Sequence, residues 1–196
     1  MVKAIIFDFG GVIIPNPWEG WNPSKEERTI IHNAISEIAK QFSVELNSSE
    51  FDTSDFEREF AIRTGKLGKE QTERIVKSIC STNKDLLPLI SKLSLKYKIF
   101  GLVNAPFGWT EVRLGVHGLN KYFGRVFTSH EIGIGKPDPK IFHYFLNATG
   151  LTPNECLFVD DVEENVSTAI KLGMQGYVFK STENFKKYLA TSRIRI

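Results

Sequence analysis

"KAIIFDFGGVII", residues 3–14, is the stretch that decides the fold. Its apolar run over 4–9 is broken only by one aspartate, Asp8, and the glycines Gly10 and Gly11 follow before apolar residues resume. A continuous apolar run is typical of a parallel strand that is covered on both faces. An ionised carboxylate at the end of such a buried strand needs a partner. We therefore expect Asp8 to have a functional role.

Similar apolar runs recur along the chain. They predict four further strands, over 98–103, 124–129, 155–160 and 176–180. Helical patterns lie between the strands, and two of them end at a glycine, where helices commonly stop. The expected helices of this part of the chain are 86–97, 137–150 and 163–173. The alternation of strands and helices predicts an α/β fold with a parallel sheet.

Residues 15–83 interrupt this alternation, because they contain no convincing strand. Ser24 and Glu27 form a capping box, and apolar residues follow them at helical spacing. Two more helices are expected, over 54–63 and 69–80. We therefore predict a core domain formed by 1–14 and 84–196, with a helical domain of 15–83 inserted between its first two strands.

Four aromatic residues lie near the ends of the predicted strands or in the insert. They are Trp18, Trp21, Phe107 and Trp109. We interpret them as packing in the core or at a hinge between the domains. Stacking on a substrate is the alternative interpretation.

The composition excludes several classes of protein. The chain has 196 residues, 24% of them charged, and a net charge of +2 without a basic stripe, so we expect no nucleic-acid partner. No segment approaches the roughly 20 apolar residues that span a bilayer, so we expect no membrane partner. The two cysteines lie far apart, without metal-type spacing. We expect a cytoplasmic protein, and the sequence carries no signal for its oligomeric state.

Polar residues follow three of the predicted strands. Asp8, Asn104 and the pair Asp160–Asp161 each stand where an apolar run stops, and Lys136 lies in the loop "GIGKPDP" before a helix. In a parallel α/β sheet, ligands bind beyond the carboxyl ends of the strands. Carboxylates suit a hard cation such as Mg²⁺, and Mg²⁺ together with a lysine suits a phosphoryl group. The sequence therefore predicts a site for a metal ion and a phosphoryl group at this edge.

The segments around these residues resemble the four motifs of the haloacid dehalogenase (HAD) superfamily, whose members are mostly phosphatases. The segments are "FDFGGV", "GLVNA", "GKPDPKIF" and "VDDVEENVSTAIKLGMQG". The fourth is the most specific, whereas "FDFGGV" alone is a weak signal. The resemblance covers 1–14 and about 86–180, and the insert is similar in position and size to the mobile cap of that family. It implies a Rossmann-like core with a small helical cap.

The resemblance also implies the chemistry. In that family the leading aspartate, here Asp8, attacks phosphorus and becomes an aspartyl-phosphate that water later hydrolyses. The implied Mg²⁺ ligands are the Asp8 carboxylate, the Gly10 carbonyl oxygen and Asp161, with Asp160 binding directly or through water. The implied substrate is a small phosphorylated metabolite.

Three further residues are implied to act on the phosphoryl group. Lys136 would neutralise the developing charge and hold Asp8 ionised. Asn104 would donate to the phosphoryl oxygens. The backbone N–H of Gly11 would approach the phosphate, because a glycine leaves room for it.

Two positions depart from the family pattern. Gly10 stands where most of the phosphatases carry a second aspartate, the general acid/base, which typically contributes about 10²- to 10⁴-fold in rate. Val103 stands where the family has a serine or threonine whose hydroxyl binds phosphate. Without the acid, we expect alkyl phosphates to react poorly and aryl or acyl phosphates to react readily.

Three functions therefore stay open. The first is a Mg²⁺-dependent phosphatase. The second, motivated by Gly10 and Val103, is a catalytically weakened member that binds a phosphorylated ligand or partner. A metal-independent haloacid dehalogenase is the third, and the paired Asp160 and Asp161 count against it because they imply a metal.

Overall fold

The computed structural model covers residues 1–196 and describes all of them except 17, 19, 43–52, 193 and 196. The chain divides into two compact units. Unit 1 is Met1–Ile13, Asn83–Asn104 and Tyr122–Ile196, and unit 2 is Ile14–Thr82 and Ala105–Lys121. This division differs from the expected one in the segment 105–121, which groups with the helical insert instead of the core. The reason is packing, because helix α6 (Trp109–Val116) lies against α1 (Lys25–Gln41) and α4 (Lys69–Cys80).

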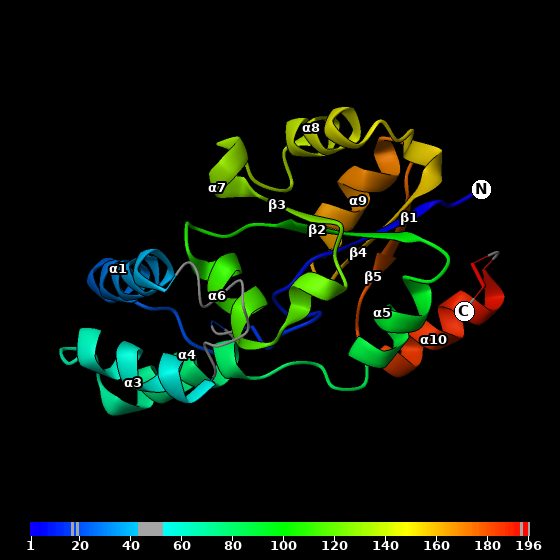
Figure 1. Cartoon of the computed structure of the whole chain (residues 1–196). Helices are drawn as coiled ribbons and strands as arrows, with labels where there is room; N and C mark the ends of the chain where they lie inside the picture. Colours follow the sequence, from blue (N-terminus) through cyan, green and yellow to red (C-terminus); the bar gives the residue numbers. More distant parts are fainter. Residues whose placement is uncertain (17, 19, 43–52, 193, 196) are drawn as a thin grey trace. The chain divides into compact units, whose positions relative to one another are not determined.

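A five-stranded parallel sheet forms the centre of unit 1 (Figure 1). Its strands are β1 (Ala4–Phe7), β2 (Lys98–Val103), β3 (Arg125–Thr128), β4 (Cys156–Asp160) and β5 (Gln175–Val178). Their order across the sheet is β3-β2-β1-β4-β5. The predicted α/β fold and all five predicted strands are confirmed. Because β1 is central and pairs with both β2 and β4, the three strands that end next to the polar residues are neighbours.

Helices cover both faces of this sheet. The helices of unit 1 are α5 (Leu87–Leu93), α7 (Ser129–Ile132), α8 (Pro139–Thr149), α9 (Glu163–Lys171), α10 (Thr182–Thr191) and the short 3-10 helix η2 (Pro153–Glu155). Figure 1 shows α8 and α9 on one face and α5 and α10 on the other. Ile6 belongs to the core on the α8–α9 face, whereas Phe7 packs edge-on against Phe185 of α10, with 6.0 Å between ring centroids. Burial on both faces explains why the strands are continuously apolar.

The loop that carries Lys136 leads directly into α8. The Asp138 side chain caps this helix by accepting a hydrogen bond from the Lys140 N–H, and Pro139 occupies its first turn. Gly150 ends the helix in the left-handed conformation, with a φ of 66°. The predicted stop at this glycine is confirmed. The predicted helix over 86–97 is shorter in the structure, where α5 ends at Leu93.

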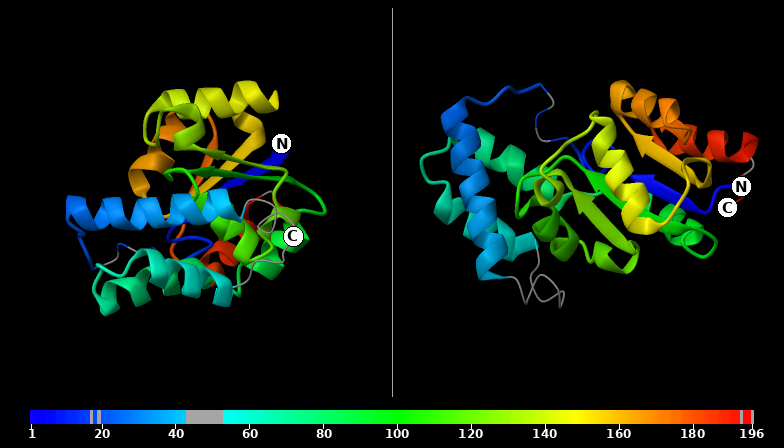
Figure 2. Two further views of the ribbon diagram at one scale, coloured as in Figure 1. Left: turned by 60° about the vertical axis from the view of Figure 1, so that its left-hand side comes forward. Right: turned by 90° about the horizontal axis from the view of Figure 1, so that it is seen from above.

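Unit 2 is helical wherever it has regular structure among its described residues (Figure 2). Its helices are α1, α3 (Thr53–Arg63), α4, α6 and the 3-10 helix η1 (Leu119–Lys121). The predicted capping box of α1 is present. The Ser24 hydroxyl accepts a hydrogen bond from the Glu27 N–H, and the Glu27 carboxylate accepts one from the Ser24 N–H. The predicted helices over 54–63 and 69–80 are confirmed as α3 and α4.

The three tryptophans pack together within unit 2. The Trp18 ring lies 5.6 Å from both Trp21 and Trp109, between ring centroids. The guanidinium of Arg28 lies over Trp18 at 5.3 Å, and that of Arg113 lies over Trp109 at 4.8 Å. These contacts support the packing interpretation of the aromatic residues.

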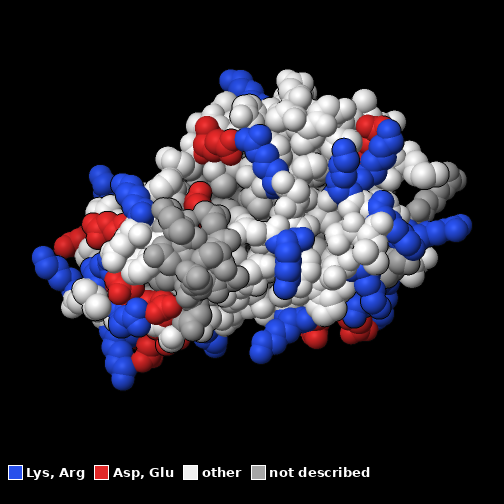
Figure 3. Space-filling model, viewed as in Figure 1, with Lys and Arg blue, Asp and Glu red and all other residues white. Residues whose placement is uncertain are grey.

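No helix in the described parts of the chain is long and apolar enough to cross a membrane. On the face that Figure 3 shows, lysine and arginine side chains are scattered, with aspartate and glutamate among them.

Candidate active site

Three carboxylates meet at the ends of β1 and β4. Asp8 is the first residue after β1, and its backbone N–H donates to the carbonyl of Val159 at 2.9 Å. Asp160 is the last residue of β4, and Asp161 follows it. Carboxylate oxygens of Asp8, Asp160 and Asp161 lie within 4.8 Å of one another. The parallel pairing of β1 with β4 thus brings together residues that are far apart in the sequence.

Lys136 joins this cluster from the loop before α8. Its Nζ donates to Asp8 Oδ1 at 2.9 Å and to Asp160 Oδ2 at 2.6 Å. The lysine side chain is 1% exposed, so the ammonium is removed from water and depends on the two carboxylates. A charged hydrogen bond of this kind is among the strong ones. Lys136 therefore fixes the position of the Asp8 carboxylate.

Both carboxylate oxygens of Asp160 accept hydrogen bonds. The residue is fully buried, and its Oδ1 accepts from the Val162 N–H at 2.8 Å. Asn165 Nδ2 donates to both carboxylate oxygens at 3.1 Å, and Lys136 Nζ also donates to Oδ2. Because both oxygens already accept hydrogen bonds, direct binding of a metal would disturb this network. The geometry favours a role for Asp160 in holding Lys136.

Sequence reasoning gave Asn165 no role. The available signal was its position five residues after Asp160, in the first turn of α9, where a side chain can reach back to the end of β4. Asn165 is buried, and a buried amide needs partners. Its hydrogen bonds to Asp160 supply them.

Asp161 lies against Gly11. A Cβ built on Gly11 would stand 2.1 Å from Asp161 Oδ2, far closer than van der Waals contact allows. Gly11 also has a φ of 75°, in the left-handed region that side chains disfavour. Both the backbone and the Asp161 carboxylate therefore require a glycine here.

This requirement gives a testable expectation for Gly11→Ala. The left-handed backbone should cost about 1–3 kcal/mol of unfolding free energy, and displacement of Asp161 should add to it. Gly10→Ala is the matched control, because no heavy atom beyond its chain neighbours lies within 4 Å of its Cβ position. Urea denaturation of the metal-free proteins measures the difference. Equal stability of the two variants would contradict the assigned contact.

The electrostatics of the cluster indicate a missing positive charge. Three carboxylates and one ammonium leave two negative charges. Burial raises the pKa of Asp8, although Lys136 opposes this rise. Burial, together with the charges of Asp8 and Asp160, raises the pKa of Asp161 to about 6. Burial alone would lower the pKa of Lys136, but the two carboxylates outweigh it and raise this pKa.

A divalent cation fits this set of donors. It would balance the two excess charges, and the oxygen ligands suit Mg²⁺. Asp161 is half-buried, and its own backbone N–H is a hydrogen-bond donor to its carboxylate, which leaves oxygen lone pairs available. Asp8 and Asp161 are therefore the carboxylates best placed to hold such an ion.

Asn104 makes a contact that the sequence did not predict. Its Oδ1 accepts from the Lys136 backbone N–H, and its Nδ2 donates to the Lys136 carbonyl, both at 2.8 Å. Gly135 leaves room for the amide, since a Cβ there would lie 3.0 Å from Asn104 Oδ1. Asn104 thus clamps the backbone of Lys136. The neighbouring Val103 is buried, and its side chain has no hydrogen-bond donor.

The parallel sheet and the cluster at its carboxyl edge define a hydrolase of the HAD class. The family model of haloacid dehalogenase-like hydrolases matches residues 2–173. The chain belongs to this family, as the sequence motifs implied.

Known proteins similar to the chain include named phosphatases. It is 26% identical to the D-ribitol-5-phosphate phosphatase of Bacteroides thetaiotaomicron over 194 residues, which cover 90% of this chain and 91% of the relative. A solved HAD-like hydrolase of Porphyromonas gingivalis superposes with a TM-score of 0.60 at 24% identity, covering 98% of this chain and all of the other.

A second solved structure was determined with ligands. It is a HAD family enzyme of Bacteroides thetaiotaomicron in complex with magnesium and inorganic phosphate, with a TM-score of 0.59 at 23% identity. It covers 96% of this chain and 99% of its own. At these identities the two structural likenesses establish the fold alone.

Proposed function

We propose that the protein is a Mg²⁺-dependent phosphatase of a small phosphorylated metabolite, with Asp8 as the nucleophile. The observation that carries the proposal is the bridge from Lys136 to Asp8 and Asp160 beside a third carboxylate, Asp161. The name of the Bacteroides relative and the magnesium and phosphate in the solved neighbour support it.

Asp8 carries out the covalent chemistry in this proposal. Its carboxylate attacks phosphorus, the bond from phosphorus to the leaving oxygen breaks, and an aspartyl-phosphate forms. Water then attacks phosphorus and releases the Asp8 carboxylate and phosphate. Lys136 keeps Asp8 oriented and offsets negative charge throughout.

The metal site would be built from Asp8, Asp161 and the Gly10 carbonyl oxygen. When bound, Mg²⁺ supplies the positive charge that offsets the charge of the phosphoryl oxygens. Asp160 stays in its hydrogen bonds to Asn165 and Lys136 and acts on the site through them.

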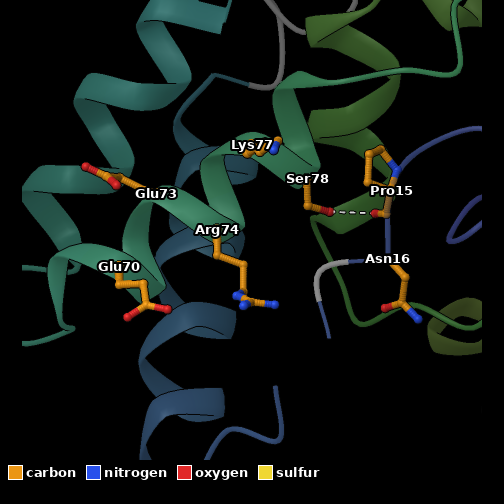
Figure 4. A pocket seen from close by; sticks show the side chains of 7 residues that line it. All are labelled: Pro15, Asn16, Glu70, Glu73, Arg74, Lys77 and Ser78. Carbon is orange, nitrogen blue, oxygen red and sulfur yellow. Dashed lines mark hydrogen bonds between the residues drawn. The ribbon is translucent and has the colours of Figure 1, made fainter. Parts of the chain in front are cut away.

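We assign substrate selection to unit 2. It contains a pocket of about 400 Å³ between the segment Pro15–Asn16 and one face of α4, a size within the usual range of small-molecule sites. Figure 4 shows Arg74 and Ser78 on this face, with the Ser78 hydroxyl donating to the Pro15 carbonyl at 2.8 Å. The remaining lining residues are Glu70, Glu73 and Lys77. A polar lining of this kind suits a polar metabolite.

The alternative function is binding of a phosphorylated ligand without efficient turnover. Gly10 and Val103 motivate it, because the first supplies no acid and the second no hydroxyl. The engaged Asp8–Lys136 pair favours the phosphatase.

A screen of phosphorylated metabolites separates the two functions. We expect phosphate release in the presence of Mg²⁺ that stops when EDTA is added. The measurement is inorganic phosphate, with calorimetric titration of the same compounds as a parallel readout. Saturable binding without release would instead support the binding function.

A further inference from the structure

The pocket of about 400 Å³ in unit 2 has two walls that are joined to each other. One wall is a face of α4, and the other is the segment Pro15–Asn16. Ser78 is buried, and its hydroxyl connects the walls by donating to the Pro15 carbonyl at 2.8 Å. The Asn16 side chain is held as well, because its Oδ1 accepts from the Trp18 N–H at 3.0 Å. The pocket is therefore formed before a ligand binds, which lowers the entropic cost of binding.

Arg74 is the α4 residue that extends into the space between the two walls. Figure 4 shows its side chain pointing from the helix towards the side on which Asn16 lies. Its guanidinium lies 5.9 Å from the centroid of the Trp21 ring, within the range of a cation–π contact. This contact restricts a long side chain, so less conformational entropy is lost when the guanidinium binds a ligand. Arg74 is therefore a preorganised hydrogen-bond donor in the pocket.

The charges of the lining residues match a ligand group with one negative charge. Glu73 is offset by Lys69, which does not line the pocket and whose Nζ lies 3.7 Å from the Glu73 carboxylate. Arg74 and Lys77 supply two positive charges, and Glu70 supplies one negative charge. Among the described residues that line the pocket, one positive charge is thus in excess. A carboxylate balances it, whereas a phosphate group carries about −1.5 to −2 charges at pH 7.

A carboxylate also matches the hydrogen-bonding capacity of these side chains. The planar fork of a guanidinium donates two parallel hydrogen bonds to the two oxygens of a carboxylate. An ionised carboxylate only accepts hydrogen bonds, and the side chains of Arg74 and Lys77 only donate them. The hydroxyl of a polyol both donates and accepts, and it carries no charge for the guanidinium to balance.

We infer that Arg74 is a specificity-determining residue and that the substrates are phosphate esters that carry a carboxylate. The inference rests on the proposed function, in which this pocket selects the substrate, and it narrows the substrate class. The guanidinium of Arg74 pairs with the carboxylate through two hydrogen bonds, and Lys77 adds a second positive charge. Because the carboxylate takes no part in the chemical step, the pair stabilises the ground state and the transition state alike. The preference should therefore lie mainly in KM.

The test compares 3-phospho-D-glycerate with racemic glycerol 3-phosphate in the presence of Mg²⁺. The two compounds share a carbon skeleton, and the first has a carboxylate where the second has a hydroxymethyl group. For the unmodified protein we expect kcat/KM to be about 10- to 100-fold higher for the glycerate, as a charged hydrogen bond would give. Steady-state release of inorganic phosphate measures it. This comparison needs no variant, so it tests the inference even if a substitution impairs folding.

Arg74→Gln should remove the preference. We expect it to raise KM for 3-phospho-D-glycerate by about 10- to 100-fold and to leave glycerol 3-phosphate unchanged. Arg74→Lys keeps the charge without the fork, so its KM should lie between those of the unmodified protein and Arg74→Gln. Arg58→Gln is the matched control, because it makes the same change in unit 2 outside the pocket, and it should keep the full preference.

The outcomes separate this inference from the proposed function. Hydrolysis of both compounds with similar kcat/KM, or release from 4-nitrophenyl phosphate alone, would overturn the inference and leave the phosphatase intact. An equal loss on both compounds in Arg74→Gln would assign this arginine to the packing of Trp21 and would overturn it too. A preference for fructose 1,6-bisphosphate over fructose 6-phosphate that depends on Arg74 would overturn the choice of a carboxylate. No phosphate release from any compound would overturn both the inference and the phosphatase.

Discussion

Asp8→Asn should abolish phosphate release while the protein stays folded. The amide keeps the shape of the side chain and loses the charge that attacks phosphorus. Loss of a nucleophile of this kind lowers turnover on the order of 10⁴- to 10⁶-fold. The measurement is steady-state phosphate release with a compound from the screen, together with circular dichroism of both proteins.

The control for this prediction is Asp85→Asn, which removes an exposed carboxylate from the same unit. It should keep the turnover of the unmodified protein. Trapping provides a second readout, because denatured protein quenched during turnover should carry phosphate in the unmodified chain and none in Asp8→Asn. Full turnover in Asp8→Asn would assign the nucleophile to another residue.

Asp161→Asn should remove most of the affinity for Mg²⁺. The substitution takes away a charged ligand and leaves the Asp160 network untouched. Calorimetric titration with MgCl₂ measures the affinity, and phosphate release should fall to the level seen with EDTA. Equal Mg²⁺ affinity in the two proteins would contradict the assignment.

The same substitution should stabilise the metal-free protein at neutral pH. The pKa of Asp161 is raised from 3.8 to about 6, so between these values the folded state binds more protons than the unfolded state. The contribution of this group to the free energy of unfolding therefore falls as pH rises through this window, and stays low above it. Asparagine carries no charge at this position, so it should remove this loss of unfolding free energy.

We expect a gain of about 1 kcal/mol near neutral pH, reduced from the full value because the carboxylate is half exposed to solvent. The gain should shrink as pH falls towards 4 and vanish below about pH 3, where both the folded and the unfolded states carry the proton. Urea denaturation in EDTA over this pH range measures it. A gain that does not depend on pH would show that the charge of Asp161 is not its source.

The sheet could be predicted because its strands are buried on both faces. Continuous apolar runs mark β1, β2 and β4, and the polar residues that end them are visible in the sequence. The grouping of 105–121 with unit 2 could not be predicted, because it depends on packing of α6 against α1 and α4. Side-chain periodicity reports that a helix has a buried face, and it does not report which helix covers that face.

The sequence predicts which residues form the candidate site, but it does not predict all of the hydrogen bonds between them. The ends of the strands and the position of the loop in the sequence predict that Asp8, Lys136 and Asp161 lie together. The clamp of Asn104 on the Lys136 backbone and the grip of Asn165 on Asp160 were not predicted. Both are hydrogen bonds of a short amide to a particular atom, and sequence spacing does not specify which atom an amide will meet.

The two segments of unit 2 are inserted into unit 1 shortly after residues of the candidate active site. They begin six residues after Asp8 and one residue after Asn104, and the chain returns to unit 1 at Asn83 and Tyr122. Neither segment interrupts a strand of the sheet. Duplication, exchange or lengthening of these segments during evolution would therefore leave the strand register and the carboxylate cluster in place. The chain is built so that recognition can diversify between descendants while the reacting residues are inherited unchanged.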